Sequence, residues 1–246
     1  MKQYRAYLFD LYGTLVDIHT DEGKAAFWKR VAAYYSAHGA AYHDAELRAA
    51  YKRLCDGETK RLQAVYPRAL IEIDLLPVFR ALYTEKGVRP ASALPADSAW
   101  AFRRASTTHL RAYAGALELL EALRAAGKTV ILLSNAQSCF TRPELDALGL
   151  TACFDHIYIS SEQGFQKPDS RFFSAPLREL SLAPSDCLMI GNDPVCDLRG
   201  AAAVGMDGVY IRSALSPGDA PQHLPEAVAS LPHMDLRRLR ALLLAD

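Results

Sequence analysis

The amino-acid sequence predicts an α/β fold in which a doubly wound parallel sheet is interrupted after its first strand by an all-helical insert. In the second half of the chain, short apolar runs alternate with helical patterns, which is typical of parallel strands joined by right-handed crossovers. Residues from about 20 to 110 carry helical patterns and no convincing strand. We therefore expect a sheet core at residues 1–17 and 112–246 and a helical insert at residues 18–111.

Length, charge and cysteine content limit the class of protein. A chain of 246 residues, 50% of them hydrophobic, is long enough for one large α/β domain or for a core with a smaller insert. The formal net charge of zero gives no support for a nucleic-acid or membrane partner. The five cysteines are scattered without a CxxC pair, and the first strand leaves no room for a signal peptide. We expect a cytoplasmic protein, monomeric or homodimeric, that binds neither nucleic acid nor a membrane.

The insert is predicted to hold four consecutive helices, an arrangement typical of a small bundle. Caps and glycines mark the ends of these helices. The first is expected to begin at Thr20 or Asp21 and end at Gly39, the second to begin at Asp44, the third to run from Asp74 to Gly87 with Pro77 in its first turn, and the fourth to span Asp97–Leu110 after a loop at Lys86–Asp97.

The core is predicted from a different pattern. The run Thr129–Leu133 is continuously apolar, as expected for a strand covered on both faces. Strands are expected at Tyr7–Phe9, Thr129–Leu133, His156–Ile159, Cys187–Ile190 and Val209–Ile211, and helices at Ala116–Ala126, Pro143–Leu148, Ser170–Leu180, Asp197–Val204 and Asp235–Leu244, with a proline-rich loop at Ser213–Leu231.

Polar residues follow four of the expected strands. Each set has an ordinary interpretation as a turn, a helix cap or a solvated lysine, but parallel strands end at one edge of the sheet, where ligands bind. Convergence there favours a functional site. The four loops contribute Asp10, Tyr12 and Thr14; Ser134 and Asn135; Gln166, Lys167 and Pro168; and Gly191, Asn192, Asp193 and Asp197.

These side chains suit the displacement of a group at phosphorus or carbon by a carboxylate. Asp10 is the expected nucleophile, and Lys167 offsets the negative charge of nucleophile and substrate. The oxygens of the transferring group are expected to bind Thr14, Ser134 and Asn135.

The same loops contain a small acidic cluster. Asp193 and Asp197 are expected to join Asp10 in holding a hard cation. Magnesium prefers oxygen ligands, few carboxylates and retained waters, so the cluster favours Mg²⁺ over calcium.

With these motifs in this order, the chain resembles the haloacid dehalogenase (HAD) superfamily, subfamily I, with a helical C1-type cap inserted after the first motif. The resemblance implies a Rossmann-like core, a covalent aspartyl intermediate and, in the phosphatase branch, magnesium. It covers essentially the whole chain and depends on motif I at Asp10–Thr14 (DLYGT), motif II at Ser134–Asn135, motif III at Lys167–Pro168 and motif IV at Gly191–Asp193 with Asp197.

The resemblance divides over the substrate. HAD phosphatases normally carry a second aspartate two residues after the nucleophile, as the general acid/base and as a metal ligand through its carbonyl, and this chain has Tyr12 there. Tyr12 resembles the metal-independent 2-haloacid dehalogenases, although Phe172 and Phe173 stand where those enzymes tend to have a tyrosine. Asp193 and Asp197 instead resemble the phosphatases, because unshielded carboxylates beside Asp10 would repel one another without a cation.

The acidic motif therefore leads us to expect a magnesium-dependent phosphohydrolase that acts on a small phosphorylated metabolite. Tyr12 or water would transfer the proton, and the carbonyl of Tyr12 would bind the metal. Two alternatives remain open: a metal-independent 2-haloacid dehalogenase, and a protein that binds a phosphorylated ligand with weak catalysis.

Overall fold

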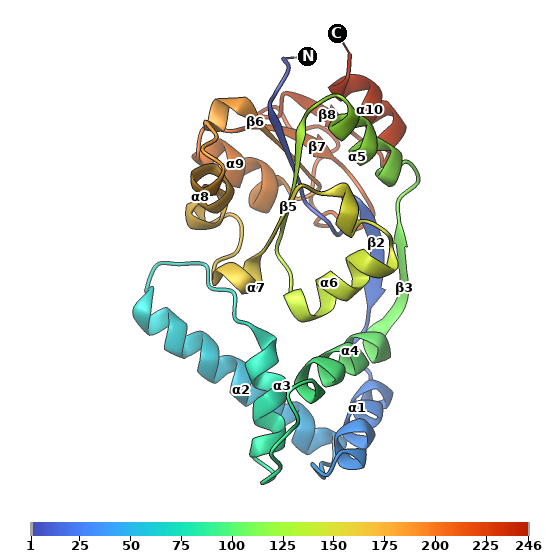
Figure 1. Ribbon diagram of the computed structural model, residues 1–246, viewed down its shortest axis with the longest axis vertical. Coiled ribbons are helices and arrows are strands. Elements are labelled where there is room, and N and C mark those ends of the chain that lie inside the picture. The colour runs from blue at the N-terminus through green and yellow to red at the C-terminus, as the bar shows by residue number, and fades with distance from the viewer. Residues whose placement is uncertain (1, 246) are drawn as a thin grey trace.

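The computed structural model describes residues 2–245, and its central feature is a six-stranded sheet in the order β5-β4-β1-β6-β7-β8 (Figure 1). All neighbouring strands of this sheet run parallel. The sheet strands are β1 (Ala6–Phe9), β4 (Thr129–Ser134), β5 (His156–Ile159), β6 (Cys187–Gly191), β7 (Asp207–Ile211) and β8 (Ala229–Leu231). The predicted α/β fold class is confirmed.

Helices cover both faces of the sheet. Their bounds are α5 (Ala116–Ala125), α6 (Ser138–Ala147), α7 (Ser160–Gln163), α8 (Ser170–Glu179), α9 (Gly200–Ala203) and α10 (Leu236–Leu243), and a π-helical turn at Pro194–Arg199 precedes α9. Within the described residues, no helix combines the length and the apolar character needed to cross a membrane.

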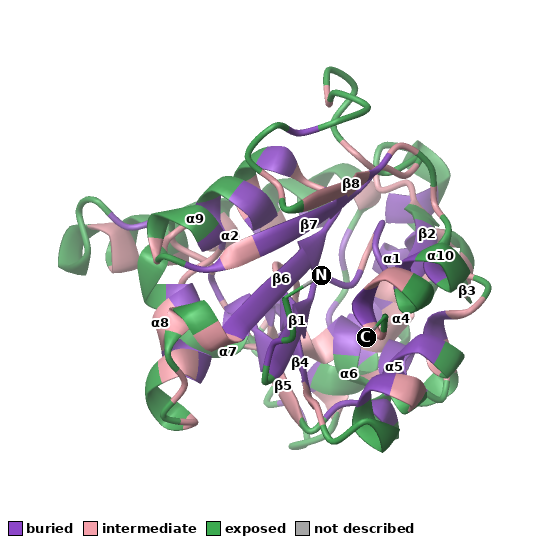
Figure 2. Cartoon of the chain, turned by 90° about the horizontal axis from the view of Figure 1, so that it is seen from above, coloured by how far each residue is buried: buried purple, intermediate pink, exposed green. Residues whose placement is uncertain are grey.

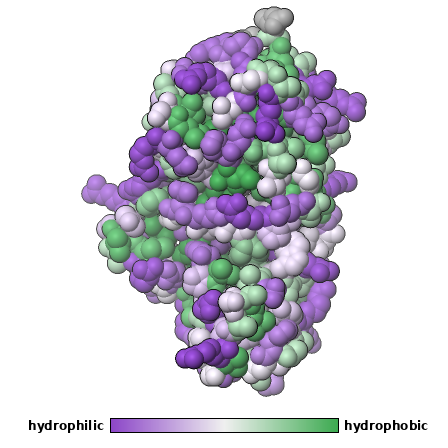
Figure 3. Space-filling view, in the orientation of Figure 1, coloured by the Kyte–Doolittle hydropathy of each residue, from purple (hydrophilic) through white to green (hydrophobic). Residues whose placement is uncertain are grey.

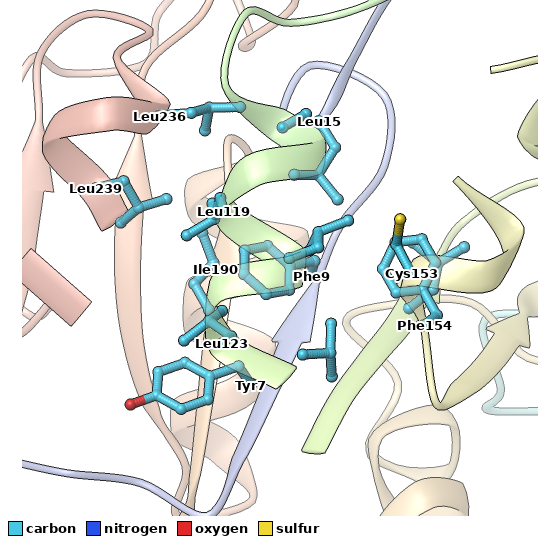
Figure 4. Close-up of a cluster of buried hydrophobic side chains, with 14 of the residues drawn as sticks. Tyr7, Phe9, Leu15, Leu119, Leu123, Cys153, Phe154, Ile190, Leu236 and Leu239 are labelled. Atoms are coloured by element: carbon cyan, nitrogen blue, oxygen red, sulfur yellow. The ribbon is translucent and has the colours of Figure 1, made fainter. Parts of the chain in front are cut away.

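The two faces of β1 belong to different hydrophobic clusters, because successive side chains of a strand point to opposite sides. Tyr7 and Phe9 pack with Leu119 and Leu123 of α5 and with α10 (Figure 4). Leu8 lies on the opposite face, in the cluster that includes residues of α8 and α9. The strands at the centre are accordingly buried along their length (Figure 2). A strand buried on both sides explains the continuously apolar runs of the sequence.

The helical insert comprises α1 (Ala25–Ala37), α2 (Asp44–Val65), α3 (Leu75–Thr84) and α4 (Leu94–Ser106) and lies at the opposite end of the molecule from the termini (Figure 1). It has its own aromatic core, in which Phe102 contacts Phe27, Trp28 and Phe79. Phe140 of α6 stacks on Phe102 and joins the insert to the sheet core. Hydrophilic residues are spread over both parts of the face seen in Figure 3.

A two-stranded antiparallel ribbon connects the insert to the sheet core. It consists of β2 (Val16–Thr20) and β3 (Thr107–Ala112). The expectation of no strand in this region is therefore wrong at its ends, and the fourth helix ends at Ser106 rather than Leu110. The reason is tertiary: the chain leaves and re-enters the core at adjacent points, so the two segments pair. The ribbon contains the expected boundaries at 17/18 and 111/112, and the division into domains there stays a prediction.

Other differences concern the ends of helices and the tail. Helix α1 begins after Lys24, without a side-chain cap from Thr20 or Asp21. Pro95 lies in the first turn of α4, which shortens the expected loop. Helix α6 begins five residues before Pro143. The tail predicted as loop contains β8, which pairs with β7 at the edge of the sheet.

Candidate active site

The four polar loops meet at one edge of the sheet, as predicted. They surround a small cavity of about 170 Å³. Its walls are formed by side chains from all four loops and by one leucine of the tail: Asp10, Tyr12, Asn135, Lys167, Asn192, Asp193, Cys196, Asp197 and Leu215.

The centre of the site is the buried ammonium group of Lys167, whose side chain is 1% exposed. Its Nζ atom donates hydrogen bonds to Asp10 Oδ1 at 2.8 Å, Asp197 Oδ1 at 2.7 Å and the carbonyl of Leu133 at 2.8 Å. Burial alone would lower the pKa of Lys167, but the charges of Asp10 and Asp197 outweigh burial and raise that pKa above its ordinary value. Lys167 therefore remains a cation and holds the two carboxylates together.

Asp197 is the most deeply buried carboxyl group of the site. Burial raises its pKa to about 7, against the opposing effect of Lys167 and with a further rise from the charge of Asp10. Its Oδ2 accepts a hydrogen bond of 2.9 Å from the backbone N–H of Asp193. Both oxygens of Asp197 are thus engaged with the protein, Oδ1 with Lys167 and Oδ2 with Asp193.

The nucleophile loop holds Asp10 from the other side. Thr14 Oγ1 donates to Asp10 Oδ2 over 3.2 Å. The turn depends on Gly13, which has a φ of +90°, and a Cβ at this position would lie 2.4 Å from the amide nitrogen of Asn192. The close approach of this loop to Asn192 therefore requires glycine.

Asn192 is a site residue to which the sequence assigned no role. With its amide nitrogen toward the loop, it donates to the carbonyl of Tyr12 and to Thr14 Oγ1 at 3.3 Å each, and its oxygen accepts from the N–H of Ser216. In the opposite orientation, the amide oxygen would face the Tyr12 carbonyl oxygen, an arrangement that a cation would stabilise. Its place between Gly191 and Asp193 was the available signal.

Asp193 caps the π-helical turn. Its Oδ1 accepts hydrogen bonds of 2.8 Å from the N–H groups of Val195 and Cys196. Among the side chains of residues 2–245, no three histidine, cysteine or acidic groups converge closely enough to hold a metal ion. A magnesium ion here would have few carboxylate ligands: the carboxylate of Asp10 and the carbonyl of Tyr12 would hold it, joined by the amide oxygen of Asn192 only when that oxygen is turned toward Tyr12.

The two residues of motif II differ in their environment. The side chain of Asn135 positions the lysine loop, because its Nδ2 donates to the carbonyl of Lys167 and its Oδ1 accepts from the N–H of Lys167. Asn135 also lines the cavity, and its second Nδ2–H leaves its role toward substrate oxygens a prediction. The hydroxyl of Ser134 is buried and has no hydrogen-bond partner among the described residues. Buried hydroxyls are normally paired, so Ser134 is a candidate donor to a ligand, although it does not itself line the cavity.

The side chain of Tyr12 is hydrogen-bonded to the neighbouring helix α6. Its hydroxyl donates to the carboxylate of Glu144 and lies 3.0 Å from Thr141 Oγ1. Desolvation, together with the charge of Glu144, raises the pKa of Tyr12 above its ordinary value. Tyr12 therefore keeps its hydroxyl proton and donates it in a hydrogen bond to Glu144. This arrangement does not favour Tyr12 as the acid/base and favours water in that role.

Comparison with known families gives the class of protein to which this chain belongs. Residues 4–205 match the haloacid dehalogenase-like hydrolase family, so the chain belongs to that family and is a hydrolase.

The relatives include both kinds of enzyme that the sequence suggested. The chain is 34% identical over 162 residues to phosphoserine phosphatase of Thermus thermophilus, covering 66% of this chain and 62% of that protein. It is 28% identical to (S)-2-haloacid dehalogenase 1 of Pseudomonas sp. strain CBS-3, over 96% of this chain and 99% of that protein. The chain thus spans less than two thirds of the phosphatase that it matches.

Solved structures show the same fold. The 2-haloacid dehalogenase of Pseudomonas syringae pv. tomato has a TM-score of 0.65, with 20% identity over 98% of each chain. The HAD-hydrolase YfnB of Bacillus subtilis, bound to magnesium, has a TM-score of 0.55, with 22% identity over 99% of this chain and 100% of that chain. At these identities the likeness concerns the fold alone.

Proposed function

We propose that the protein hydrolyses a small phosphorylated metabolite through an aspartyl-phosphate on Asp10. The observation that carries this proposal is the cavity at which Asp10 and Lys167 meet. The buried Ser134 hydroxyl, at the end of the neighbouring strand β4, does not line this cavity but has no partner among the described residues and is the candidate donor. Such a donor suits a phosphoryl oxygen. The cavity is small, and most of the residues that line it are polar or charged, which supports a compact polar group rather than an alkyl chain.

In this mechanism, an Asp10 oxygen attacks phosphorus, the bond from phosphorus to the leaving oxygen breaks, and water supplies the proton to that oxygen. A second water then attacks the phosphorus of the aspartyl-phosphate and regenerates the Asp10 carboxylate. Lys167 orients Asp10 and offsets charge, while Ser134 binds a phosphoryl oxygen. Magnesium, bound through Asp10, the Tyr12 carbonyl and Asn192, with Asp193 nearby, would neutralise the charge of the phosphoryl oxygens.

A 2-haloacid dehalogenase is the second candidate. Two observations favour it: Tyr12 gives no positioned acid/base, and three acidic side chains do not converge on a metal within the described part of the chain. The similarity to a dehalogenase over nearly the full length points the same way. In that case Asp10 would displace the halide from carbon, and the resulting ester would be hydrolysed without metal.

The test is phosphate release from a panel of phosphorylated metabolites and an aryl phosphate, with magnesium and with EDTA, beside halide release from 2-chloropropionate. We expect magnesium-dependent phosphate release that is lost in the Asp10→Asn variant. Halide release that is indifferent to EDTA would overturn the phosphatase proposal. Thermal stabilisation by phosphorylated ligands without turnover would instead favour a binding protein.

We further propose that the enzyme works in the cytoplasm as a monomer or homodimer. The support is chemical: all five cysteines are unpaired, as is usual in a reducing compartment.

A further inference from the structure

A buried ion pair joins the helical insert to the sheet core beside the nucleophile loop. Arg103, on α4 of the insert, donates from Nε to Oε1 of Glu144 on α6 at 2.5 Å and from Nη2 to Oε2 at 3.4 Å. The Arg103 side chain is 13% exposed and that of Glu144 is 2% exposed. Charges removed from water to this degree depend on each other, because either one left alone would be costly.

The same carboxylate holds Tyr12. Glu144 accepts a hydrogen bond from the hydroxyl of Tyr12, and the guanidinium carbon of Arg103 lies 5.7 Å from the centre of the Tyr12 ring. Tyr12 is therefore fixed at its hydroxyl by one partner and at its ring by the other. Arg103 and Tyr12 thus share one buried carboxylate: Arg103 binds both of its oxygens, and Tyr12 donates to Oε2.

Tyr12 in turn belongs to the turn that carries the nucleophile. It lies two residues after Asp10, and its neighbour Gly13 is in the close approach to Asn192 described above. Within this turn, the N–H of Gly13 donates to the carbonyl of Val16 and Thr14 donates to Asp10. A displacement of the Tyr12 ring would be transmitted along this short, hydrogen-bonded segment to the Asp10 carboxylate.

The position of Arg103 also depends on the position of the insert. It lies in the last turn of α4, just before β3 of the ribbon, and Figure 1 shows α4 running into β3 beside α6. Thr107, the first residue of β3, donates its hydroxyl to the carbonyl of Arg103 at 2.7 Å. Any swing of the insert about the ribbon would therefore move Arg103 relative to Glu144.

We propose that Arg103 is a positioning residue: from the insert, it holds Glu144 on the Tyr12 hydroxyl and thereby sets the Asp10 loop for attack. Arg103 does not touch the reacting atoms in this role. The inference rests on the hydrolase activity for its kinetic readout only, since loop order is measurable without turnover.

The kinetic test uses an aryl phosphate, or 2-chloropropionate if that proves to be the substrate. Arg103→Met leaves the buried carboxylate of Glu144 without its cation, and this variant could fail to fold. The variant to measure is therefore the double variant Arg103→Met/Glu144→Gln, which leaves no buried charge without a partner. We expect kcat to fall about 100-fold with KM nearly unchanged, as misplacement of a nucleophile predicts. Tyr12→Phe should lose as much, and Tyr12→Phe combined with the double variant should lose no more. Arg103→Lys should recover part of kcat.

The second readout is hydrogen–deuterium exchange over residues 10–16, which should become several-fold faster in both Tyr12→Phe and the double variant. The matched control is Arg53→Met, which removes the arginine of the Arg53–Glu85 pair on the outer surface of the insert and should change neither exchange nor kcat. Additive losses in kcat, a change in KM alone, or exchange equal to that of the wild type would each overturn the proposal. A wild type without turnover would refute the proposed function, while the exchange data would still decide this one.

Discussion

The ammonium of Lys167 and the carboxylate of Asp10 are joined by a 2.8 Å hydrogen bond in the buried centre of the site. The lysine comes from motif III and the aspartate from the end of β1, 157 residues apart. This ion pair fixes the position of the Asp10 carboxylate, which lines the cavity. Because Lys167 also binds Asp197, one cation organises two carboxylates, and the first prediction follows from that dependence.

Replacing Lys167 by methionine should abolish turnover and lower the free energy of unfolding by about 3–5 kcal/mol, since Asp10 and Asp197 would remain buried without a cation. Urea unfolding at pH 7.5 measures the loss. The double variant Lys167→Met/Asp197→Asn, which removes one of the stranded charges, should regain much of the stability and none of the activity. A single variant as stable as the wild type would contradict the assigned role of Lys167.

Ser134→Ala should lower kcat by about 100-fold, as expected for the loss of one donor to a developing negative charge. The free energy of unfolding should change by less than about 0.5 kcal/mol, because the hydroxyl gives up no hydrogen bond within the described residues. Ser160→Ala is the matched control: its buried hydroxyl bonds Glu72 and the backbone of Ala136, so stability should fall by about 1 kcal/mol. Equal effects in the two variants would argue against a ligand role for Ser134.

Gly13→Ala should disable the enzyme. The variant combines a strained φ of +90° with a Cβ placed 2.4 Å from Asn192, so the loop must move away from the site. Gly127→Ala separates the two effects: its φ is +72° but a Cβ would meet nothing within 4 Å, so it should cost only about 1–2 kcal/mol of strain. Turnover and thermal unfolding of both variants check this. Full activity in Gly13→Ala would show that the close approach to Asn192 is dispensable.

Glu72 should make stability depend on pH. This residue of the insert bonds Gln137 and Ser160 of the core, and burial raises the pKa of its carboxyl above the ordinary value, against the effect of both hydrogen bonds. The folded state therefore binds a proton more tightly than the unfolded state does. Its contribution to stability is complete below the unfolded pKa and is lost as pH rises through the folded pKa.

Glu72→Gln removes that titration. The ordinary pKa of glutamate is about 4.3. The variant should therefore gain stability relative to the wild type as pH rises from about 4 toward neutrality. Urea unfolding of both proteins between pH 4 and pH 8 gives the difference. A difference that stays constant with pH would mean that Glu72 titrates normally in the folded protein.

The alternation of apolar runs and helical patterns was sufficient to predict the sheet. Strands buried on both faces, such as Thr129–Ser134, are continuously apolar and are therefore recognisable in the sequence. It missed the ribbon of β2 and β3. Residues such as Thr107 and His109 carry no apolar alternation, and they form a strand only because residues 16–20 lie opposite. Pairing of this kind depends on tertiary structure, which local sequence patterns do not contain.

For the site, the sequence predicted which loops come together better than it predicted the contacts of each side chain. It located Asp10 and Lys167 because carboxyl ends of parallel strands share an edge. It assigned Asn135 to substrate oxygens and did not predict that the amide of Asn135 binds the backbone of Lys167, a contact set by three-dimensional proximity. The Glu144 partner of Tyr12 was equally out of reach, since it lies in a helix with no motif of its own.

The ribbon that joins insert and core has a consequence for how the chain accommodates so large an interruption. Val16 pairs with Ala112, and Asp17 is bridged to Arg111 at 2.7 Å, so the points of departure and return are tied together. Loop-closure entropy grows only slowly with length, and here the ends are already closed. To the parallel sheet, the whole insert is equivalent to one hairpin turn. Its helices can therefore be lengthened, shortened or exchanged for others without moving a strand that carries residues of the candidate site.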